Sequence, residues 1–155
     1  MNSGQLRIDT DNVGNAISRG VDLSRATSAT LTFSYTNSLV GADRIELRVS
    51  TDGGANYQTI SGGIFSSATH TGSGTASFDL SGYMSADTKI QFIVTATGGG
   101  DRLYVDNVQV SFDTPTNAAP TISNVGGDNL SYTEGAGAVV IDQGANALVV
   151  DADSA

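Results

Sequence analysis

Apolar and polar residues alternate along much of the chain, the pattern of strands with one buried face. Leu31, Phe33 and Tyr35 are separated by serine and threonine, and a spacing of two places them on one side of a strand. The same alternation recurs at residues 44–50 and 88–95. No long window keeps apolar positions at helical spacing without an interrupting glycine, so we expect almost no helix.

The alternating runs and the turns between them predict eight short strands before residue 113. Turn-forming residues such as Asp52, Gly53 and Gly54 separate the runs, and a short turn is expected near residues 82–86. Strands at this spacing predict an all-β fold, an antiparallel β-sandwich of the jelly-roll kind. The predicted strands are residues 5–8, 16–23, 29–36, 44–50, 57–61, 75–80, 88–95 and 102–112.

The only two prolines, Pro115 and Pro120, lie in a polar stretch and predict a linker. The segment after the linker is shorter than a usual freestanding domain, so we expect a truncated second module. The chain is therefore divided into a jelly-roll module at 1–112, a linker at 113–120 and the start of a second β module at 121–155. Its strands are expected at residues 121–125, 130–133, 138–141 and 147–150.

In the predicted strand at residues 102–112, the apolar residues alternate in two ways that conflict with each other. Val108 and Val110 define one apolar face, and steps of two place Asp106 on that same face. Leu103 and Val105 favour the opposite phase. Because burying an unpaired carboxylate is unfavourable, Asp106 needs a cation, an arginine, or a β-bulge that moves its side chain to the rim.

The charge balance restricts the partners of this protein. There are 16 acidic residues against 7 Lys and Arg, a net charge of -9, which repels phosphate backbones and anionic membrane surfaces. We therefore expect no nucleic-acid partner and no membrane insertion, and hard cations as the complement. The absence of cysteine excludes disulfides and thiolate chemistry.

Acidic, asparagine-rich loops make calcium the expected cofactor, because Ca²⁺ is bound by roughly six to eight oxygen ligands. The loop at residues 9–15 offers Asp9, Asp11 and Asn12 as ligands. The alternative for this loop is a solvated turn held by local hydrogen bonds. Asp106 and Asn107 form the second candidate, and the two candidates could be one site.

Several short motifs, taken in their order along residues 4–112, resemble the jelly-roll modules of giant bacterial surface proteins. These modules are similar to galactose-binding-like and carbohydrate-binding β-sandwiches. The resemblance implies an extracellular or cell-surface location. Family members usually carry an aromatic strand ahead of the segment that here starts at Gly4, so we expect a natural first strand to be missing. The motifs lie at residues 18–24, 29–35, 49–54 and 104–108.

The tail looks like the start of a cadherin-like tandem repeat of secreted adhesins. The resemblance rests on residues 119–122, 132–135 and 151–154. It implies further calcium ligands at Glu134, Asp151 and Asp153, and neighbouring modules of the same chain as partners.

No pattern of catalytic residues is evident, and we expect no enzymatic activity. His70, the only histidine, lies in a polar stretch and is expected to be an exposed loop residue. The chain has neither the Gly-x-Ser-x-Gly elbow of hydrolases nor a phosphate-binding loop ahead of a helix.

A carbohydrate site usually needs an exposed aromatic ring, and this chain has no tryptophan. Tyr35 and Tyr104 fit the core alternation, which leaves Tyr57 and Tyr83 as candidate platforms. The alternative is that both rings pack at strand ends. The leading hypothesis is a non-catalytic, calcium-binding module of an adhesin, with a glycan or cell-surface protein as partner. The other hypothesis is a carbohydrate-binding module.

Overall fold

The computed structural model describes residues 4–124, 133–138 and 148–151. The chain divides into two compact units, Met1–Pro115 and Thr116–Ala155. Among the described residues, no helix is long and apolar enough to cross a membrane. The strands of the first unit are β1 (Leu6–Asp9), β2 (Ala16–Val21), β3 (Ser28–Asn37), β4 (Arg44–Ser50), β5 (Gln58–Ser66), β6 (Gly72–Asp79), β7 (Thr88–Ala96) and β8 (Arg102–Asp113), with one 3-10 turn, η1 (Ser81–Tyr83).

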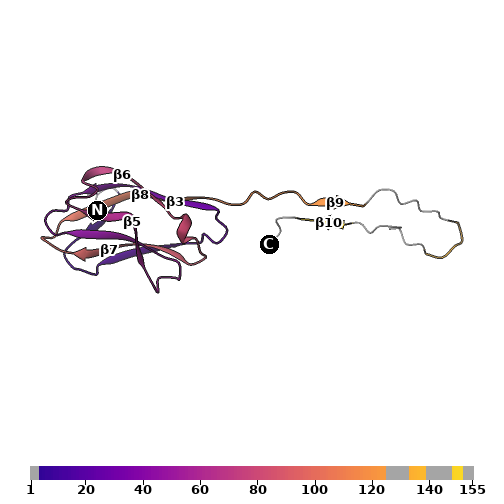
Figure 1. Cartoon of the computed structure of the whole chain (residues 1–155), viewed down its shortest axis with the longest axis horizontal. Coiled ribbons are helices and arrows are strands. Elements are labelled where there is room, and N and C mark those ends of the chain that lie inside the picture. Colours follow the sequence, from indigo (N-terminus) through magenta and orange to yellow (C-terminus); the bar gives the residue numbers. More distant parts are fainter. Residues whose placement is uncertain (1–3, 125–132, 139–147, 152–155) are drawn as a thin grey trace. The chain divides into compact units, whose positions relative to one another are not determined.

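These strands form two four-stranded antiparallel sheets (Figure 1). The β8 sheet has the order β1-β8-β3-β6, and the β4 sheet has the order β2-β7-β4-β5. This arrangement is an eight-stranded jelly roll, so the predicted fold class is confirmed. The strand at Arg44–Ser50 has the predicted bounds, whereas β5 runs on to Ser66 instead of ending at residue 61.

The hydrophobic core lies between the two sheets and is built from the inward positions of the alternating strands. Phe33 is at its centre, with its ring centroid 6.0, 5.8 and 5.3 Å from those of Phe65, Phe78 and Phe92. His70 is half-buried and stacks on Phe65 with centroids 4.4 Å apart, so the prediction of an exposed loop histidine is wrong. Alternation within one strand does not predict this contact, because Phe65 lies in β5 and His70 lies in the loop that follows β5.

A β-bulge in β8 changes which side chains face the core. The register pairs Ser34 with Asp106 and Thr32 with Gln109. Two β8 residues therefore oppose the single β3 residue in between, which is the geometry of a bulge. Asn107 takes up the left-handed conformation with φ 52°, which asparagine tolerates better than most residues. The bulge predicted near Asp106 is confirmed.

On the side of the bulge before Asp106, Leu103 and Val105 are fully buried. Tyr104 and Asp106, which alternate with them, therefore point to the outer face of the β8 sheet. The prediction that Tyr104 lies in the core is wrong. It assumed that the alternation seen at Val108 continues back to Tyr104, but the bulge between them shifts the alternation by one residue.

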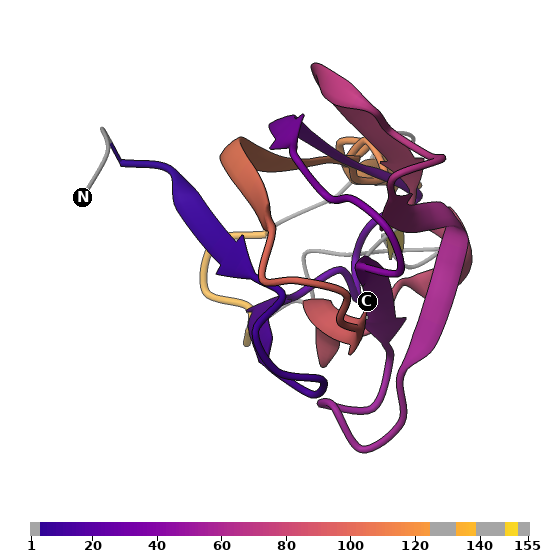
Figure 2. The ribbon, with the colours of Figure 1, turned by 90° about the vertical axis from the view of Figure 1, so that its left-hand side faces the viewer.

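The edge strand β1 pairs with only part of β8. Their antiparallel register runs from Leu6 opposite Val105 to Asp9 opposite Arg102, and Figure 2 shows β1 at one margin of the sandwich. Among the described residues, no strand pairs with the outer edge of β8 from Asp106 to Asp113. That edge of β8 is therefore unpaired within residues 4–124.

The second unit has one described strand pair, in which β9 (Thr121–Ser123) runs antiparallel to β10 (Leu148–Val150). Both lie within predicted strand ranges. The strands predicted at residues 130–133 and 138–141 lie largely outside the described residues.

Candidate binding sites

Three loops bring a pair of carboxylates together at one end of the sandwich. Asp43 lies just before β4 and Asp101 just before β8. The backbone N–H and the side-chain hydroxyl of Thr10 both donate to the Asp101 carbonyl, at 3.0 and 3.1 Å. Gly98 N–H donates to Asp43 Oδ1 at 2.6 Å. A side chain at Gly98 would come within 2.9 Å of the Ala42 nitrogen, so the close approach of these loops requires glycine there.

Each of these two carboxylates has one buried oxygen without a hydrogen-bond partner among the described residues, Oδ2 of Asp43 and Oδ2 of Asp101. Asp43 is 1% exposed, so water does not solvate it freely. An unpaired buried carboxylate oxygen is costly. A bound cation or an ordered water would satisfy these two oxygens.

Burial is the largest influence on Asp43 and by itself raises its pKa. The hydrogen bond from the Gly98 N–H favours the ionised form, and the pKa of Asp43 lies below its usual range. The arrangement of oxygens is chemically suited to a hard cation.

The loop at residues 9–15 contributes to the same end of the sandwich. A side chain on Gly100 would lie 2.7 Å from Oδ1 of Asp11, which places Asp11 beside the loop that carries Asp101. Asp9 is occupied differently, because its carboxylate accepts from Arg7 at 2.8 Å and Arg102 at 3.1 Å. The hydrogen bond from Arg7 is the main reason that the pKa of Asp9 is lowered. Asn12 is exposed.

The other predicted calcium ligands lie elsewhere. Oδ1 of Asp106 accepts from the Asn107 N–H at 2.8 Å, and the Asn107 side chain donates to Ser34 at 3.1 Å. Asp9 is paired with Arg102 on β8. Asp106 is four residues further along the same strand, about 13 Å away, so Asp9 and Asp106 do not form a single site. In the second unit, Glu134 and Asp151 are exposed, whereas Asp153 lies outside the described residues.

Asp43 and Asp101 share a local sequence pattern that could have pointed to this pair. Both carboxylates occur in the same short motif, Gly-x-Asp-Arg, at residues 41–44 and 99–102, each time directly before a strand. Within the described parts of the chain, no group of three or more His, Cys, Asp or Glu side chains could hold a metal ion. A cation at the pair would therefore also need carbonyl, hydroxyl or water oxygens.

The outer face of the β8 sheet carries a second candidate site. The register places Arg7 of β1, Tyr104 of β8, Thr36 of β3 and Ser73 of β6 side by side in one row. We call these four residues the Tyr104 row. Thr36 and Ser73 share a hydrogen bond of 2.9 Å between their hydroxyls. The row therefore combines one half-buried aromatic ring with a guanidinium and two hydroxyls.

The two tyrosines predicted as carbohydrate platforms are both half-buried. Tyr57 lies against the turn at Gly54, where an added side chain would come within 2.9 Å of the Tyr57 hydroxyl. Tyr83 packs against the hydrophobic core. The role of these two rings in carbohydrate binding stays a prediction.

No family model and no curated protein matches this sequence. Among solved structures, it is similar to TmCBM61 in complex with β-1,4-galactotriose, with 15% identity and a TM-score of 0.43, over 72% of this chain and 90% of that chain. It is also similar to a glycoside hydrolase family 43 arabinoxylan arabinofuranohydrolase from Bacillus subtilis in complex with cellotetraose. That match has 17% identity and a TM-score of 0.42, over 70% of this chain but 21% of that chain. Because both similarities are low, the carboxylate pair and the Tyr104 row are argued from the residues of this chain alone.

Proposed function

We propose that the first unit is a non-catalytic carbohydrate-binding module that uses the Tyr104 row. The observation that carries this proposal is the outward position of Tyr104, between Arg7 on one neighbouring strand and Thr36 on the other. An aromatic face packs against the C–H surface of a sugar ring, while the flanking polar groups bind its hydroxyls. The row offers both kinds of contact on one rigid sheet.

The rest of this face suits a neutral, hydroxyl-rich ligand. Ser34 and Thr75 lie opposite each other in neighbouring strands, and Ser34 is also paired with Asp106 of β8, so the next outward positions are two hydroxyls and one carboxylate, all of which can bind sugar hydroxyls. The Arg7 guanidinium is held by Asp9 at 2.8 Å, which fixes its position and balances its charge. Preorganised donors of this kind lose little freedom when a ligand binds.

The test is to measure binding to a glycan array and then, by calorimetry, to β-1,4-galactotriose and cellotetraose. Tyr104→Ala is expected to raise Kd by at least about tenfold, or about 1.4 kcal/mol, whereas Tyr104→Phe keeps the ring and most of the affinity. Tyr57→Ala is the matched control and is expected to bind like the wild type. Binding to no glycan, or binding that depends on Tyr57 and not on Tyr104, would contradict the proposal.

A second observation supports a bound calcium ion, namely the two unpartnered oxygens of Asp43 and Asp101. We propose that these two residues hold the ion, with Asp11 close by on the loop before β2. Calcium there would neutralise the pair and tie together the loops before β2, β4 and β8. Its role is structural, because it stabilises the folded state without touching the Tyr104 row.

Calcium is expected to raise the melting temperature, because a ligand that binds only the folded state stabilises it, by about 2.7 kcal/mol at a hundredfold excess over Kd. Asp101→Asn should abolish this shift, whereas Asp87→Asn, at an exposed position, should leave it intact. Sodium chloride at equal ionic strength controls for general screening of the net charge of -9.

An ordered water in place of the ion would give a different result. In that case the wild type would show no calcium shift, and calcium would affect the melting temperatures of the wild type and Asp101→Asn alike. That pair of results would overturn the calcium proposal while leaving the glycan proposal untouched.

The setting of the module is proposed from the sequence resemblance alone. We propose that it belongs to a secreted or cell-surface adhesin in which neighbouring modules follow along the chain. Detection of the protein on the cell surface by antibody labelling of intact cells tests this location. Labelling only after the cells are permeabilised would contradict it.

A further inference from the structure

Basic side chains gather on the outer face of the β4 sheet, the face turned away from the hydrophobic core. Arg44 and Arg48 occupy outward positions of β4, and Lys89 occupies an outward position of β7. These are three of the seven Lys and Arg residues of the chain, whereas the four strands of this sheet contain only one of its 16 acids, Glu46. The face is therefore positive in a protein whose net charge is -9.

One buried carboxylate holds both arginines in place. Nε of Arg44 donates to Oε1 of Glu46 at 3.1 Å, and Nε and Nη2 of Arg48 donate to Oε2 at 3.1 and 3.0 Å. Thr59 and Thr95 donate to the same carboxylate. Within the described residues, neither Nη of Arg44 and not Nη1 of Arg48 makes a hydrogen bond. Two guanidinium groups thus surround a single negative charge, with an excess positive charge and unused N–H donors.

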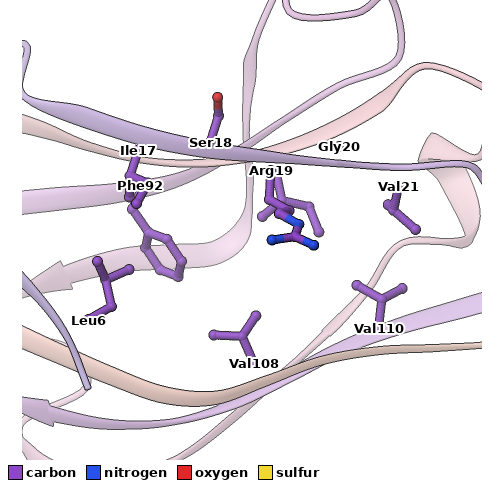
Figure 3. Close-up of a pocket in the computed structure, with 10 residues that line it drawn as sticks. Leu6, Ile17, Ser18, Arg19, Gly20, Val21, Phe92, Val108 and Val110 are labelled. Atoms are coloured by element: carbon purple, nitrogen blue, oxygen red, sulfur yellow. The ribbon is translucent and has the colours of Figure 1, made fainter. Parts of the chain in front are cut away.

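Neutral polar side chains lie in line with Arg48 across the sheet. The register places Ser18 of β2, Gln91 of β7, Arg48 and Thr59 of β5 side by side. Figure 3 shows the side chains of Ser18 and Arg19 on opposite sides of β2, so Ser18 belongs to the outer face while Arg19 points to the space between the sheets. Hydroxyl and amide groups both donate to and accept from the hydroxyls of a sugar.

We propose that the outer face of the β4 sheet binds an acidic polysaccharide, whose sugar carboxylates pair with Arg44 and Arg48. A guanidinium binds a carboxylate through two parallel hydrogen bonds. Because Glu46 already holds both arginines, they lose little freedom when a ligand binds. This site lies on the other sheet from the Tyr104 row, and the proposal does not rest on glycan binding there.

The composition of the face favours a polysaccharide over other acidic partners. The core of a protein interface is rich in aromatic residues and poor in charge, but among the described residues no aromatic side chain occupies an outward position of these four strands. A nucleic acid is disfavoured by the net charge of -9. Ile64 and Ile93, which flank Glu46 in register, are half-buried and offer apolar contact to the C–H surface of a sugar ring.

The probes are cellotetraose and the matching tetramer of β-1,4-linked glucuronic acid, which differ only in their carboxylates. Binding to the whole chain is measured by calorimetry in Tyr104→Ala, which lacks the ring proposed for neutral glycans. The acidic tetramer is expected to bind saturably and cellotetraose at least about tenfold more weakly. Binding of the acidic tetramer should also weaken as sodium chloride is raised, because salt screens exposed charges.

In this background, Arg44→Gln is expected to weaken binding of the acidic tetramer by at least about fivefold, because it removes a charged donor pair. The variant is expected to fold, since Glu46 keeps its hydrogen bonds from Arg48 and Thr59. Arg25→Gln is the matched control. It removes the same charge from an exposed position between β2 and β3 and should leave binding unchanged. The unfolding transition of each variant shows that it is folded.

The proposal is overturned if the acidic tetramer does not bind saturably, or if Arg44→Gln and Arg25→Gln weaken it equally. Tetraglutamate that binds as tightly as the acidic tetramer would also overturn it, because the face would then select negative charge alone. A dimer that Arg44→Gln dissociates, detected by sedimentation, would show that a second copy covers the face and would overturn it too. Because all these measurements use protein without the Tyr104 ring, the two glycan proposals can fail separately.

Discussion

At the scale of single residues, the acidic side chains of this protein differ sharply in their environments. Asp9 and Glu46 are neutralised by arginines of the same strand and its neighbours. Asp43 and Asp101, by contrast, each keep a buried oxygen without a hydrogen-bond partner in the described part of the chain. Counting acids in the sequence cannot separate these cases, because the pair comes together only when loops distant in sequence meet. Asp43 and Asp101 were not among the predicted ligands, and the role of Asp11 as a ligand stays a prediction.

Glu46 is a buried acid whose ionised form is stabilised on the outer face of the β4 sheet. Thr59 donates to its Oε2 at 2.6 Å, and Arg48 and Arg44 approach it at 3.0 and 3.1 Å. Burial is the largest influence and by itself raises the pKa of Glu46, but these hydrogen bonds and charges outweigh it and the pKa is lowered. The folded state therefore binds its proton less readily than the unfolded state.

This lowered pKa predicts an acid-sensitive contribution to stability. The contribution is complete above the pKa of an unfolded glutamate, about 4.3, and is lost as the pH falls below it through the folded pKa. Glu46→Gln should therefore flatten the fall in melting temperature between about pH 5 and pH 3. The control variant is Glu134→Gln. Glu134 is the only other glutamate of the chain, and its side chain is exposed in the second unit. Parallel curves for the wild type and Glu46→Gln would contradict the prediction.

At the scale of strands, alternation predicts faces well wherever a strand is regular. β4 and β7 follow their predicted phase along their whole lengths, with Ile45, Leu47 and Val94 fully buried. β8 has two phases, and the conflict between them was enough to predict a bulge. The conflict did not identify the residue at which the phase changes, so Tyr104 was placed on the wrong side. A bulge depends on cross-strand pairing, here with β3, which a single strand's sequence does not contain.

The bulge makes a specific demand on residue 107. Because Asn107 has φ 52°, Asn107→Val should lose about 1–2 kcal/mol of the free energy of unfolding, since a β-branched residue is strained in this region. Asn107→Gly tolerates the conformation and loses mainly the hydrogen bond to Ser34. Urea unfolding followed by tyrosine fluorescence measures both variants. Equal stability of the valine and glycine variants would show that the bulge does not depend on this conformation.

At the scale of the whole molecule, the fold class could be predicted but not the pairing of strands. Alternation says which side of a strand is buried, yet it carries no information about which strands are neighbours. The jelly-roll order joins the first strand to the last, residues 6–9 to residues 102–105. The two prolines predicted a linker at residues 113–120, and the boundary between the two compact units falls at Pro115. That β1 pairs with residues 102–105 of β8 became apparent only from the register.

The antiparallel register of β1 and β8 also determines how the sandwich would respond to mechanical force. The chain enters β1 at Leu6, opposite Val105, and leaves β8 at Asp113, so both ends emerge in the same direction along these strands. Tension applied through the two ends would load the β1–β8 ladder in an unzipping geometry, in which the bonds near Leu6 break first and the rest follow one by one. A shearing geometry would instead load all of them together. The β1–β8 pairs from Leu6–Val105 to Asp9–Arg102 would therefore separate one after another under tension.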